Sequence, residues 1–367
     1  MRAILLSGAV SLFISLLGTR VAITQFRRLG WGKQIRDDGP TSHHTKMGTP
    51  TMGGLVIMLA TVVGYFLAKL VTMTAPTASA LLILGLYVGL GAVGFLDDYI
   101  QIVRQRNLGL RSRAKMIGQT LVALVFGGLA LSPWLKDEHG ITPASRHISF
   151  IRDWSGVGIP AVIVMLLIWL IVTATSNGVN LADGLDGLAA GSSVMVFGAY
   201  MLVNIWQNNQ SCFSERLDPA NQNLCYTVRD PLDLAVLAAA LTGACFGFLW
   251  WNASPAAIFM GDTGSLSLGG AVAGLAIMTR TELLLVILGG LFVMETLSVM
   301  IQVTTFKITR RLTGKGRRVF RIAPIHHHFE MLGWEQVTVT IRFWIITGIC
   351  VAAGLGIFYA EWVSGIG

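Results

Sequence analysis

Five aspartates at or beside the ends of apolar segments are the residues of this chain best suited to chemistry. They are Asp97, Asp98, Asp183, Asp186 and Asp262, and they come from three segments that are far apart in the sequence. A carboxylate close to lipid is costly and usually faces a protein or aqueous cavity. Oxygen ligands of this kind are those that Mg²⁺ prefers. The pattern therefore predicts one cation-binding site built from all five aspartates.

The first two of these aspartates are adjacent, in the sequence Phe95-Leu-Asp97-Asp98-Tyr99. Neighbouring residues of a helix point about 100° apart, so the two carboxylates need not do the same work. If both lined a cavity, their repulsion would raise the pKa of one of them unless a cation lay between them. That situation is typical of a general base or a metal ligand. The alternative is a pair of acids at a helix end in water.

Two further segments carry the other three aspartates. The segment Asn177-Gly-Val-Asn180-Leu-Ala-Asp183-Gly-Leu-Asp186-Gly187 has an oxygen-bearing side chain at every third position, which one face of a helix cannot present. We therefore expect a loop that leads into a helix, with its side chains directed at a sugar, a uracil ring or a metal. Asp262 follows Gly261, where the start of a helix would offer N–H groups to phosphate and a lone carboxylate would suit Mg²⁺. Ordinary turn and capping chemistry is the alternative for both segments.

Basic and imidazole side chains in other loops suit the binding of phosphate. Lys46 precedes a bend rich in glycine and threonine and is a candidate phosphate clamp, the alternative being a plain interfacial lysine. The consecutive histidines 326–328 diverge and lack accompanying cysteines, so we interpret them as donors to a phosphate or sugar rather than as a zinc site. Glu295, inside an apolar segment, is either a proton relay or a buried structural carboxylate.

These residues are set in a chain of 367 residues that is 53% apolar and only 13% charged, with a mean hydropathy of +0.66. A helix needs roughly 20 apolar residues to cross a bilayer, and the sequence offers about ten such runs. We expect spans at 3–24, 52–72, 78–96, 116–133, 158–176, 188–206, 232–251, 265–279, 283–306 and 338–360. The composition excludes a soluble protein and predicts an all-α integral membrane protein, with 1–367 as a single domain. Because the basic residues lie beside the apolar runs, nucleic acid is not expected as a partner.

The loops on alternate sides of these spans differ strongly in charge. Most of the 27 Lys and Arg residues lie near the loops at about 25–51, 97–115, 177–187, 252–264 and 307–337. The positive-inside rule makes that side cytoplasmic. Both termini and the loops at about 134–157 and 207–231 are then external. Cys212 and Cys225 share the second external loop, and whether they form a disulfide stays open.

Several of these motifs resemble, in the same order, those of the bacterial phospho-N-acetylmuramoyl-pentapeptide transferases. They are Gly48-Thr-Pro-Thr-Met-Gly-Gly54, Phe95-Leu-Asp97-Asp98-Tyr99, the segment 177–187, Phe259-Met-Gly-Asp262 and Pro324-Ile-His326-His327-His328-Phe-Glu330. The resemblance covers nearly the whole chain. It implies transfer of phospho-MurNAc-pentapeptide from UDP-MurNAc-pentapeptide to undecaprenyl phosphate, with lipid I and UMP as products, for peptidoglycan synthesis. It also implies a homodimer in the bacterial plasma membrane, with its site on the cytoplasmic face.

The resemblance further assigns roles position by position. The residues that it implies to be catalytic are Asp97, Asp98, Asp262 and His326, with Asp262 as the ligand of Mg²⁺. Those that it implies to bind substrate are Lys46, Thr51, Lys115, Asn180, Asp183, Asp186, Asn252, Phe259, Gln302, His327 and His328. Where the family often has a lysine shortly after the acidic pair, this chain has Gln101, so the phosphate contact of that lysine is not carried over.

Alternatives to this function remain at the level of sequence. A transferase of the same superfamily would move GlcNAc-1-phosphate to the same lipid, although the three successive histidines favour the muramoyl-pentapeptide reaction. An ion-coupled transporter also tolerates intramembrane acids, but it predicts internal repeats and acids near the middle of the spans, whereas these acids lie toward one face. For the transferase, we favour direct attack by a lipid phosphate that Asp97 deprotonates or positions, over a covalent aspartyl-phosphate.

Overall fold

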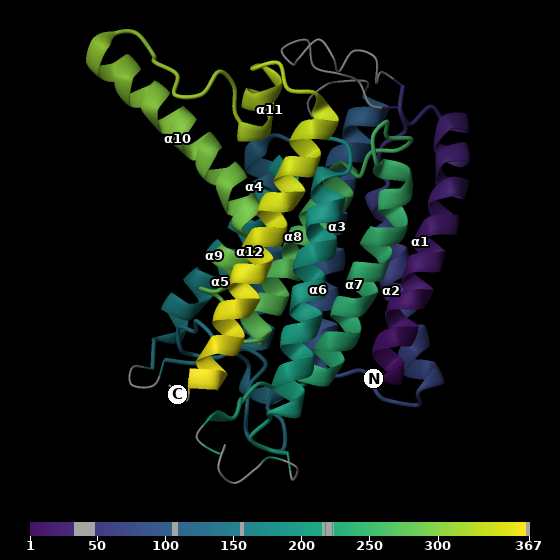
Figure 1. The fold of residues 1–367 in the computed structure, drawn as a ribbon, viewed down its shortest axis with the longest axis vertical. Coiled ribbons are helices and arrows are strands. Elements are labelled where there is room, and N and C mark those ends of the chain that lie inside the picture. The colour runs from purple at the N-terminus through teal and green to yellow at the C-terminus, as the bar shows by residue number, and fades with distance from the viewer. Residues whose placement is uncertain are drawn as a thin grey trace.

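The computed structural model describes residues 1–32, 48–104, 109–154, 158–214, 217, 222 and 224–364, which form an upright bundle of helices (Figure 1). The α-helices are α1 (Arg2–Arg28), α2 (Gly54–Val71), α3 (Ala78–Val103), α4 (Ser112–Ala130), α5 (Ala161–Ala182), α6 (Leu188–Asn209), α7 (Pro231–Asn252), α8 (Gly261–Met278), α9 (Leu285–Leu288), α10 (Gly290–Thr313), α11 (Ile325–Glu330) and α12 (Gln336–Ser364). A 3-10 helix spans Pro133–Leu135. Otherwise the described residues form only isolated β-bridges, which confirms the predicted all-α class.

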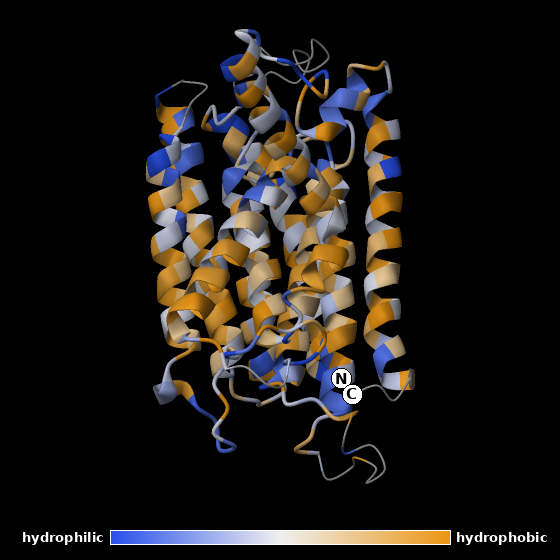
Figure 2. Ribbon diagram, turned by 90° about the vertical axis from the view of Figure 1, so that its left-hand side faces the viewer, coloured by the Kyte–Doolittle hydropathy of each residue, from blue (hydrophilic) through white to orange (hydrophobic). Residues whose placement is uncertain are grey.

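Eight helices among the described residues are long and apolar enough to cross a membrane, so this is a multi-pass membrane protein. They are α1, α2, α3, α5, α6, α7, α10 and α12. Figure 2 shows apolar residues along the middle of the bundle and polar residues toward its two ends. Two further expected spans coincide with α4 and α8, which are not among the eight. Every residue of α8 except Asp262 is buried, so protein encloses this helix and its sequence need not be apolar.

Several helices extend beyond the expected spans, so the expected cytoplasmic loops were too long. Helix α3 continues to Val103 and α5 continues to Ala182, which places Asp97, Asp98 and Asn180 within helices rather than in loops. Backbone hydrogen bonding does not stop where the apolar run stops, provided that the protein satisfies the polar side chains. The expected span 283–306 is also two helices instead of one, because the chain breaks between α9 and α10 at Gly289.

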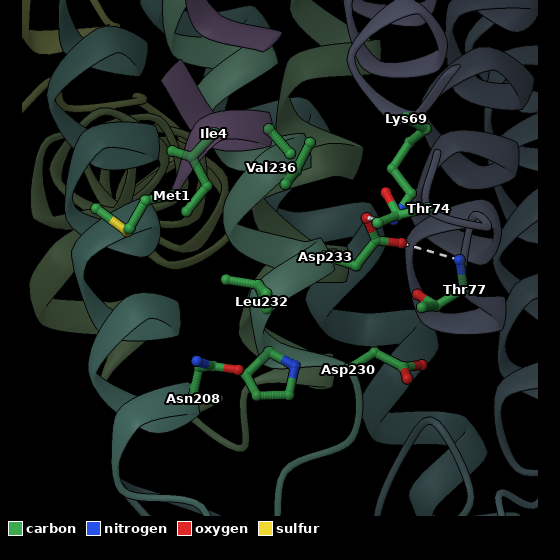
Figure 3. A pocket seen from close by; sticks show the side chains of 12 residues that line it. Met1, Ile4, Lys69, Thr74, Thr77, Asn208, Asp230, Leu232, Asp233 and Val236 are labelled. Carbon is green, nitrogen blue, oxygen red and sulfur yellow. Dashed lines mark hydrogen bonds and ion pairs between the residues drawn. The ribbon is translucent and has the colours of Figure 1, made fainter. Parts of the chain in front are cut away.

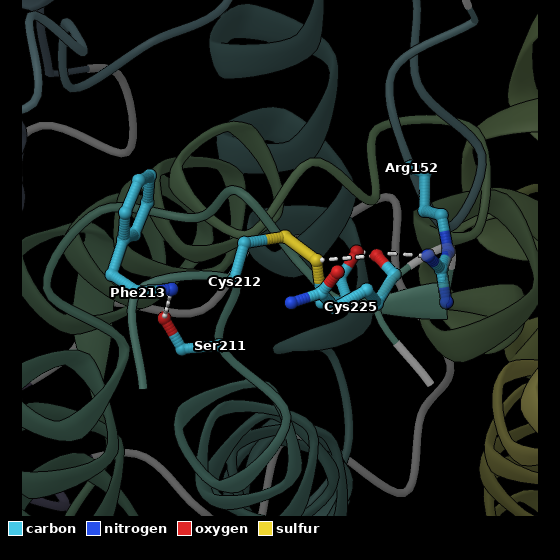
Figure 4. Close-up of a disulfide and its surroundings, with 6 residues drawn as sticks. Arg152, Ser211, Cys212, Phe213 and Cys225 are labelled. Carbon is cyan, nitrogen blue, oxygen red and sulfur yellow. Dashed lines mark hydrogen bonds between the residues drawn. A yellow bond between two sulfur atoms is a disulfide. The ribbon is translucent and has the colours of Figure 1, made fainter. Parts of the chain in front are cut away.

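Both termini lie at the same end of the bundle, and the segments 252–261 and 325–330 lie at the opposite end (Figure 1). We call these the terminal end and the site end. At the terminal end a disulfide joins Cys212 to Cys225, which settles the pairing that the sequence left open (Figure 4). The carbonyl of Cys225 accepts a hydrogen bond from Nη1 of Arg152 at 2.8 Å, and Nε of Arg152 lies 2.8 Å from Oε1 of Glu361 in α12. The disulfide loop is thereby tied to the last helix.

A second polar cluster at the terminal end joins α2 to α7 beside a cavity of about 240 Å³ (Figure 3). Nζ of Lys69 lies 2.9 Å from Oδ1 of Asp233, and both side chains are buried. Oδ2 of Asp233 accepts hydrogen bonds at 2.8 Å from the hydroxyl of Tyr65 and from the backbone N–H of Thr77. The buried carboxylate is therefore fully paired, as a charge inside a membrane bundle must be.

Close packing of α3 against α8 depends on the absence of a side chain at Gly94. A Cβ atom at this position would lie 2.2 Å from the carbonyl oxygen of Asp262 and 2.6 Å from the backbone nitrogen of Thr263. Backbone atoms cannot move aside as the end of a flexible side chain can. Gly94 therefore sets how closely α3 approaches the first turn of α8, one helical turn before Asp97 and Asp98.

We expect Gly94→Ala to destabilise the protein by about 1–3 kcal/mol, because the added methyl group must push two helices apart. The matched control is Gly85→Ala in the same helix, where a Cβ meets nothing within 4 Å. That change should be neutral or slightly stabilising, since alanine is the better helix former. Thermal unfolding of both variants in detergent measures the difference, and equal melting temperatures would contradict this account of the α3–α8 contact.

Candidate active site

Three of the five aspartates meet at the site end of the bundle. Asp97 and Asp98, from the last turns of α3, and Asp262, from the first turn of α8, each offer a carboxylate oxygen within 4.8 Å of the others. Asp97 and Asp98 are buried, with 4% of each residue exposed. Asp183 and Asp186 are not part of this cluster, so the prediction of one site from five aspartates was wrong for these two.

The carboxylate of Asp98 caps the N-terminus of α8. Its Oδ1 accepts the backbone N–H of Asp262 at 3.1 Å, and its Oδ2 accepts the backbone N–H of Thr263 at 2.9 Å and the Thr263 hydroxyl at 2.7 Å. The first N–H groups of a helix have no partner within it and carry its positive dipole, so a negative charge from a neighbouring helix satisfies both demands. Gly261 makes room, since its φ is +75° and a Cβ there would lie 2.6 Å from Oδ2 of Asp98.

The other two carboxylates have different partners. Oδ2 of Asp97 accepts the amide of Gln101 at 2.7 Å, and its Oδ1 accepts the backbone N–H of Leu110 at 2.7 Å. Asp262 pairs with the ammonium group of Lys115 from α4. Its Oδ1 also accepts the amide of Asn180 from α5 at 2.7 Å. Four helices, α3, α4, α5 and α8, therefore converge on this cluster.

Among the described residues this cluster is a group of carboxylates that could hold a metal ion, and its chemistry suits a hard cation. All three side chains offer oxygen, the donor that Mg²⁺ prefers. Three carboxylates lie within 4.8 Å of one another, and in the described part of the chain the ammonium of Lys115 pairs with one of them, Asp262. A divalent cation would remove the remaining repulsion.

The turn between α5 and α6 forms the next part of the site end. Asp186 is buried, and its Oδ2 accepts the backbone N–H of Ala256 at 3.1 Å. Oδ1 of Asn252 accepts the backbone N–H of Gly187 at 3.1 Å, while its amide donates to the carbonyl of Ile258 at 2.9 Å. The predicted residues Asp183, at the C-cap of α5, and Asp186 therefore lie in a turn that the 252–258 loop supports.

The motif that begins at Gly48 packs against the motif that ends at Asp262. The backbone N–H groups of Gly53 and Gly54 donate to the carbonyls of Phe259 and Met260 at 2.8 and 2.9 Å, and the N–H of Phe259 donates to the carbonyl of Pro50 at 2.8 Å. Thr51 is buried within this contact. Two predicted substrate-binding residues, Thr51 and Phe259, are thus brought together. Lys46 lies outside the described residues.

One face of α10 holds the segment that carries the histidines. The hydroxyl of Ser298 accepts the backbone N–H of Ile325 at 3.0 Å. Further along the helix, Oε1 of Gln302 accepts the N–H of Val319 at 3.0 Å and that of Phe320 at 2.9 Å. Its Nε2 donates to the Phe320 carbonyl at 3.0 Å. In this structure Gln302 binds the chain itself, and its predicted contact with substrate stays a prediction.

The three consecutive histidines have three different environments. His326 is fully buried, with its Nδ1 3.0 Å from Oε1 of Glu295 in α10. Nδ1 of His327 lies 2.5 Å from Oε2 of Glu330 in the same short helix. Nδ1 of His328 accepts the backbone N–H of Arg321 at 3.1 Å. Their Nδ1 atoms therefore have three different partners, but the rings of His326 and His327 lie against each other, with 4.1 Å between the ring centres, so the predicted divergence does not hold for these two.

Two contributors to this site were missed by sequence reasoning, and a third, Gln101, was noted only for the lysine that it replaces. Thr263 helps to fix the position of Asp98, Ser265 accepts the amide of Asn180 at 2.8 Å, and Gln101 donates to Asp97. The only sequence signals for these residues were that Thr263 and Ser265 lie at the start of an expected helix and that Gln101 follows the acidic pair by about one helical turn. Which oxygen each hydroxyl or amide meets depends on how α3, α5 and α8 pack.

The helical bundle and its carboxylate cluster define a polytopic membrane protein with an acidic site at one end, and comparison with known proteins agrees. A model of glycosyl transferase family 4 matches residues 80–280. The chain is 77% identical to a phospho-N-acetylmuramoyl-pentapeptide-transferase of a Nocardioides species, with 100% of both chains covered. It is 60% identical to the transferase of this name from Frankia casuarinae and 56% identical to that from Streptomyces avermitilis, with 99% of each chain covered.

The chain belongs to the phospho-N-acetylmuramoyl-pentapeptide-transferases, as these identities over its whole length show. It is accordingly an enzyme of the transferase class. The carboxylates, the lysine and the asparagine of the site occur in this chain itself, in the arrangement described above.

The cap that Asp98 forms on α8 generates a prediction about Thr263. Thr263→Val keeps the shape of the side chain but removes its hydrogen bond to a buried carboxylate, so we expect a loss of about 1–3 kcal/mol in stability. The control is Thr242→Val in α7, where the hydroxyl bonds only to the Ala238 carbonyl of its own helix. Thermal unfolding measures both. A Thr263 variant as stable as the Thr242 variant would show that the cap contributes nothing through this hydroxyl.

Proposed function

We propose that this chain transfers phospho-MurNAc-pentapeptide from UDP-MurNAc-pentapeptide to undecaprenyl phosphate, with formation of lipid I and release of UMP. A phosphate oxygen of the lipid attacks the phosphorus that carries the sugar, and the bond from that phosphorus to the oxygen of UMP breaks. The observation that carries the proposal is the cluster of Asp97, Asp98 and Asp262 with Lys115 at one end of an apolar bundle, in a chain 77% identical to a relative named for this reaction.

The charges at the cluster suit the approach of two anionic phosphates. The ammonium of Lys115 and the amide of Asn180 both point at Asp262, so both can also reach a phosphoryl group that is bound there. Donors arranged before the reaction stabilise the charge that develops in its transition state. Asp97, which is not needed for the α8 cap, is assigned to deprotonate or position the lipid phosphate. Asp98 acts mainly by placing Asp262.

Magnesium is the cation that we propose for this cluster, with Asp262 as a ligand and the carboxylates of Asp97 and Asp98 close enough to share it. Bound there, it would neutralise phosphate charge and polarise the phosphorus–oxygen bonds. The substrate-binding roles of Lys46, Thr51, Asp183, Asp186, Asn252, Phe259, Gln302, His327 and His328, and a catalytic role of His326, are part of the same proposal.

The topology that we propose has about ten crossings, counting α4 and α8 with the more apolar helices. The site end then faces the cytoplasm of a bacterial plasma membrane, where basic residues such as Arg310, Arg311 and Arg318 gather. Both termini and the disulfide loop face outward, into an oxidising compartment that suits a disulfide. A homodimer is also proposed, on the basis of the family.

The reaction is tested by release of UMP from UDP-MurNAc-pentapeptide in the presence of undecaprenyl phosphate. We expect release with Mg²⁺, none after chelation, and none with UDP-GlcNAc as the donor. Asp262→Asn should lower kcat by about 100-fold or more, since the cation contributes several kcal/mol and about 1.4 kcal/mol is tenfold. Asp233→Asn, which removes a buried carboxylate at the terminal end, should leave kcat nearly unchanged. Full activity of the Asp262 variant would refute the metal assignment, and UMP release from UDP-GlcNAc alone would favour the GlcNAc-1-phosphate reaction.

The orientation is tested by labelling thiols from one side of the membrane. After reduction, a membrane-impermeant maleimide should label Cys212 and Cys225 in spheroplasts but not in inverted vesicles. A Thr313→Cys variant that lacks this cysteine pair provides the opposite control, because residue 313 ends α10 at the site end and is exposed. Labelling of the native pair only in inverted vesicles would reverse the proposed orientation.

A further inference from the structure

A buried acid and a buried imidazole form a pair behind the histidine segment. Glu295 in α10 and His326 in α11 both have 0% of their side chains exposed, and Oε1 of Glu295 lies 3.0 Å from Nδ1 of His326. Neither group can reach water, because both side chains are fully buried. Removing a charge from water is unfavourable unless an opposite charge or hydrogen-bond donors replace the water.

The imidazole is the polar partner available to this carboxylate. Within the described part of the chain, neither oxygen of Glu295 accepts a hydrogen bond from a different residue, and its close polar contact is the 3.0 Å between Oε1 and Nδ1 of His326. The backbone carbonyl of Glu295 is occupied separately, by the hydroxyl of Ser298 at 2.7 Å. An ionised carboxylate only accepts hydrogen bonds, so a favourable contact with a ring nitrogen 3.0 Å away needs a proton on that nitrogen. The position of Glu295 therefore selects the form of His326 that carries a proton on Nδ1.

The other ring nitrogen of His326 points toward the turn between α5 and α6. A Cβ atom at Gly184 would lie 2.3 Å from Nε2 of His326 and 3.3 Å from Nε2 of His327, so both imidazole edges lie against the backbone between Asp183 and Asp186. Only glycine leaves room for them. Nε2 of His326 is buried and has no hydrogen-bond partner among the described residues. A fixed, unpartnered ring nitrogen beside the turn that carries Asp183 and Asp186, which we propose to bind substrate, is suited to a polar group of the substrate.

Neighbouring residues hold this pair in place. Ser298, one turn after Glu295 on α10, accepts the backbone N–H of Ile325, the residue before His326. The ring of His327 packs on that of His326 with 4.1 Å between the ring centres, and its own Nδ1 is paired with Glu330. The same helix therefore positions both the backbone and the ring of His326.

We propose that Glu295 is a positioning residue for His326: it holds the proton on Nδ1 and fixes the plane of the ring, so that Nε2 meets a polar group of the bound nucleotide-sugar. Glu295 itself does not touch substrate. A carboxylate behind an imidazole commonly sets which ring nitrogen bears the proton and how the ring is oriented. This inference rests on the proposed transferase function, which it deepens by assigning a role to an acid inside the membrane bundle.

The kinetic test is a double-mutant cycle on UMP release. Glu295→Gln should lower kcat/KM by about 10- to 100-fold, the range for carboxylates that orient an imidazole. In a His326→Gln background the same change should have no further effect, because Glu295 acts only through that ring. Glu361→Gln, which removes a partly buried carboxylate beside Arg152 at the terminal end, is the control and should leave kcat/KM unchanged. Multiplying losses in the double variant, or a fully active Glu295→Gln, would overturn the proposal.

A spectroscopic test does not depend on activity. In protein with ¹⁵N-labelled histidine, the signal that is lost in His326→Gln identifies His326, and its Nδ1 should show a bound proton in the wild type. In Glu295→Gln, that ring should change to a different protonation pattern while thermal unfolding stays cooperative. An unprotonated Nδ1 in the wild type would overturn the proposal even if Glu295→Gln failed to fold. If the wild type released no UMP, the proposed function would fail, and this spectrum would still decide on the pair.

Discussion

The contact between the carboxylate of Asp98 and the first turn of α8 is the interaction on which the site depends. Helix α8 begins inside the bundle, where its free N–H groups cannot be satisfied by water, and Asp98 supplies the missing acceptors from α3. The same contact places Asp262 beside Asp97. A cap between helices therefore does two things at once, since it allows a helix to start in a buried position and it assembles a group of carboxylates.

Helix backbones approach one another closely around this cap, and this explains why glycine occurs at the points of contact. Gly94 lets α3 pack on the peptide between Asp262 and Thr263, and Gly54 at the start of α2 would meet the nitrogen of Gly264 at 2.1 Å if it had a Cβ. Helices in membranes gain little from burying apolar surface against one another, so close packing and hydrogen bonds must supply the association. The acidic cluster lies beside these close backbone contacts, which limits how far its carboxylates can move apart.

The two ends of the bundle use their buried charges differently. At the terminal end, Lys69 with Asp233 and Arg152 with Glu361 form closed pairs, and these join elements that are distant in the sequence. At the site end, three carboxylates face one ammonium group, and His326 retains a ring nitrogen without a hydrogen-bond partner among the described residues. Structural charges are satisfied within the protein, whereas the charges at the site end leave capacity for a cation and an anionic substrate.

Composition and motif order determined the all-α membrane class, the approximate spans and the identity of the acids, because hydropathy and residue type are local properties of the chain. Residue type and hydropathy alone did not separate Asp97, Asp98 and Asp262 from Asp183 and Asp186, a division that only the family resemblance implied, since which carboxylates share one cavity depends on the rotation of α3, α5 and α8 about their axes. Nor could they show that Gln302 holds the backbone of Phe320, or that Glu295 lies beside His326. Those pairings join residues on different elements, and only the packing of the bundle brings them within hydrogen-bonding distance.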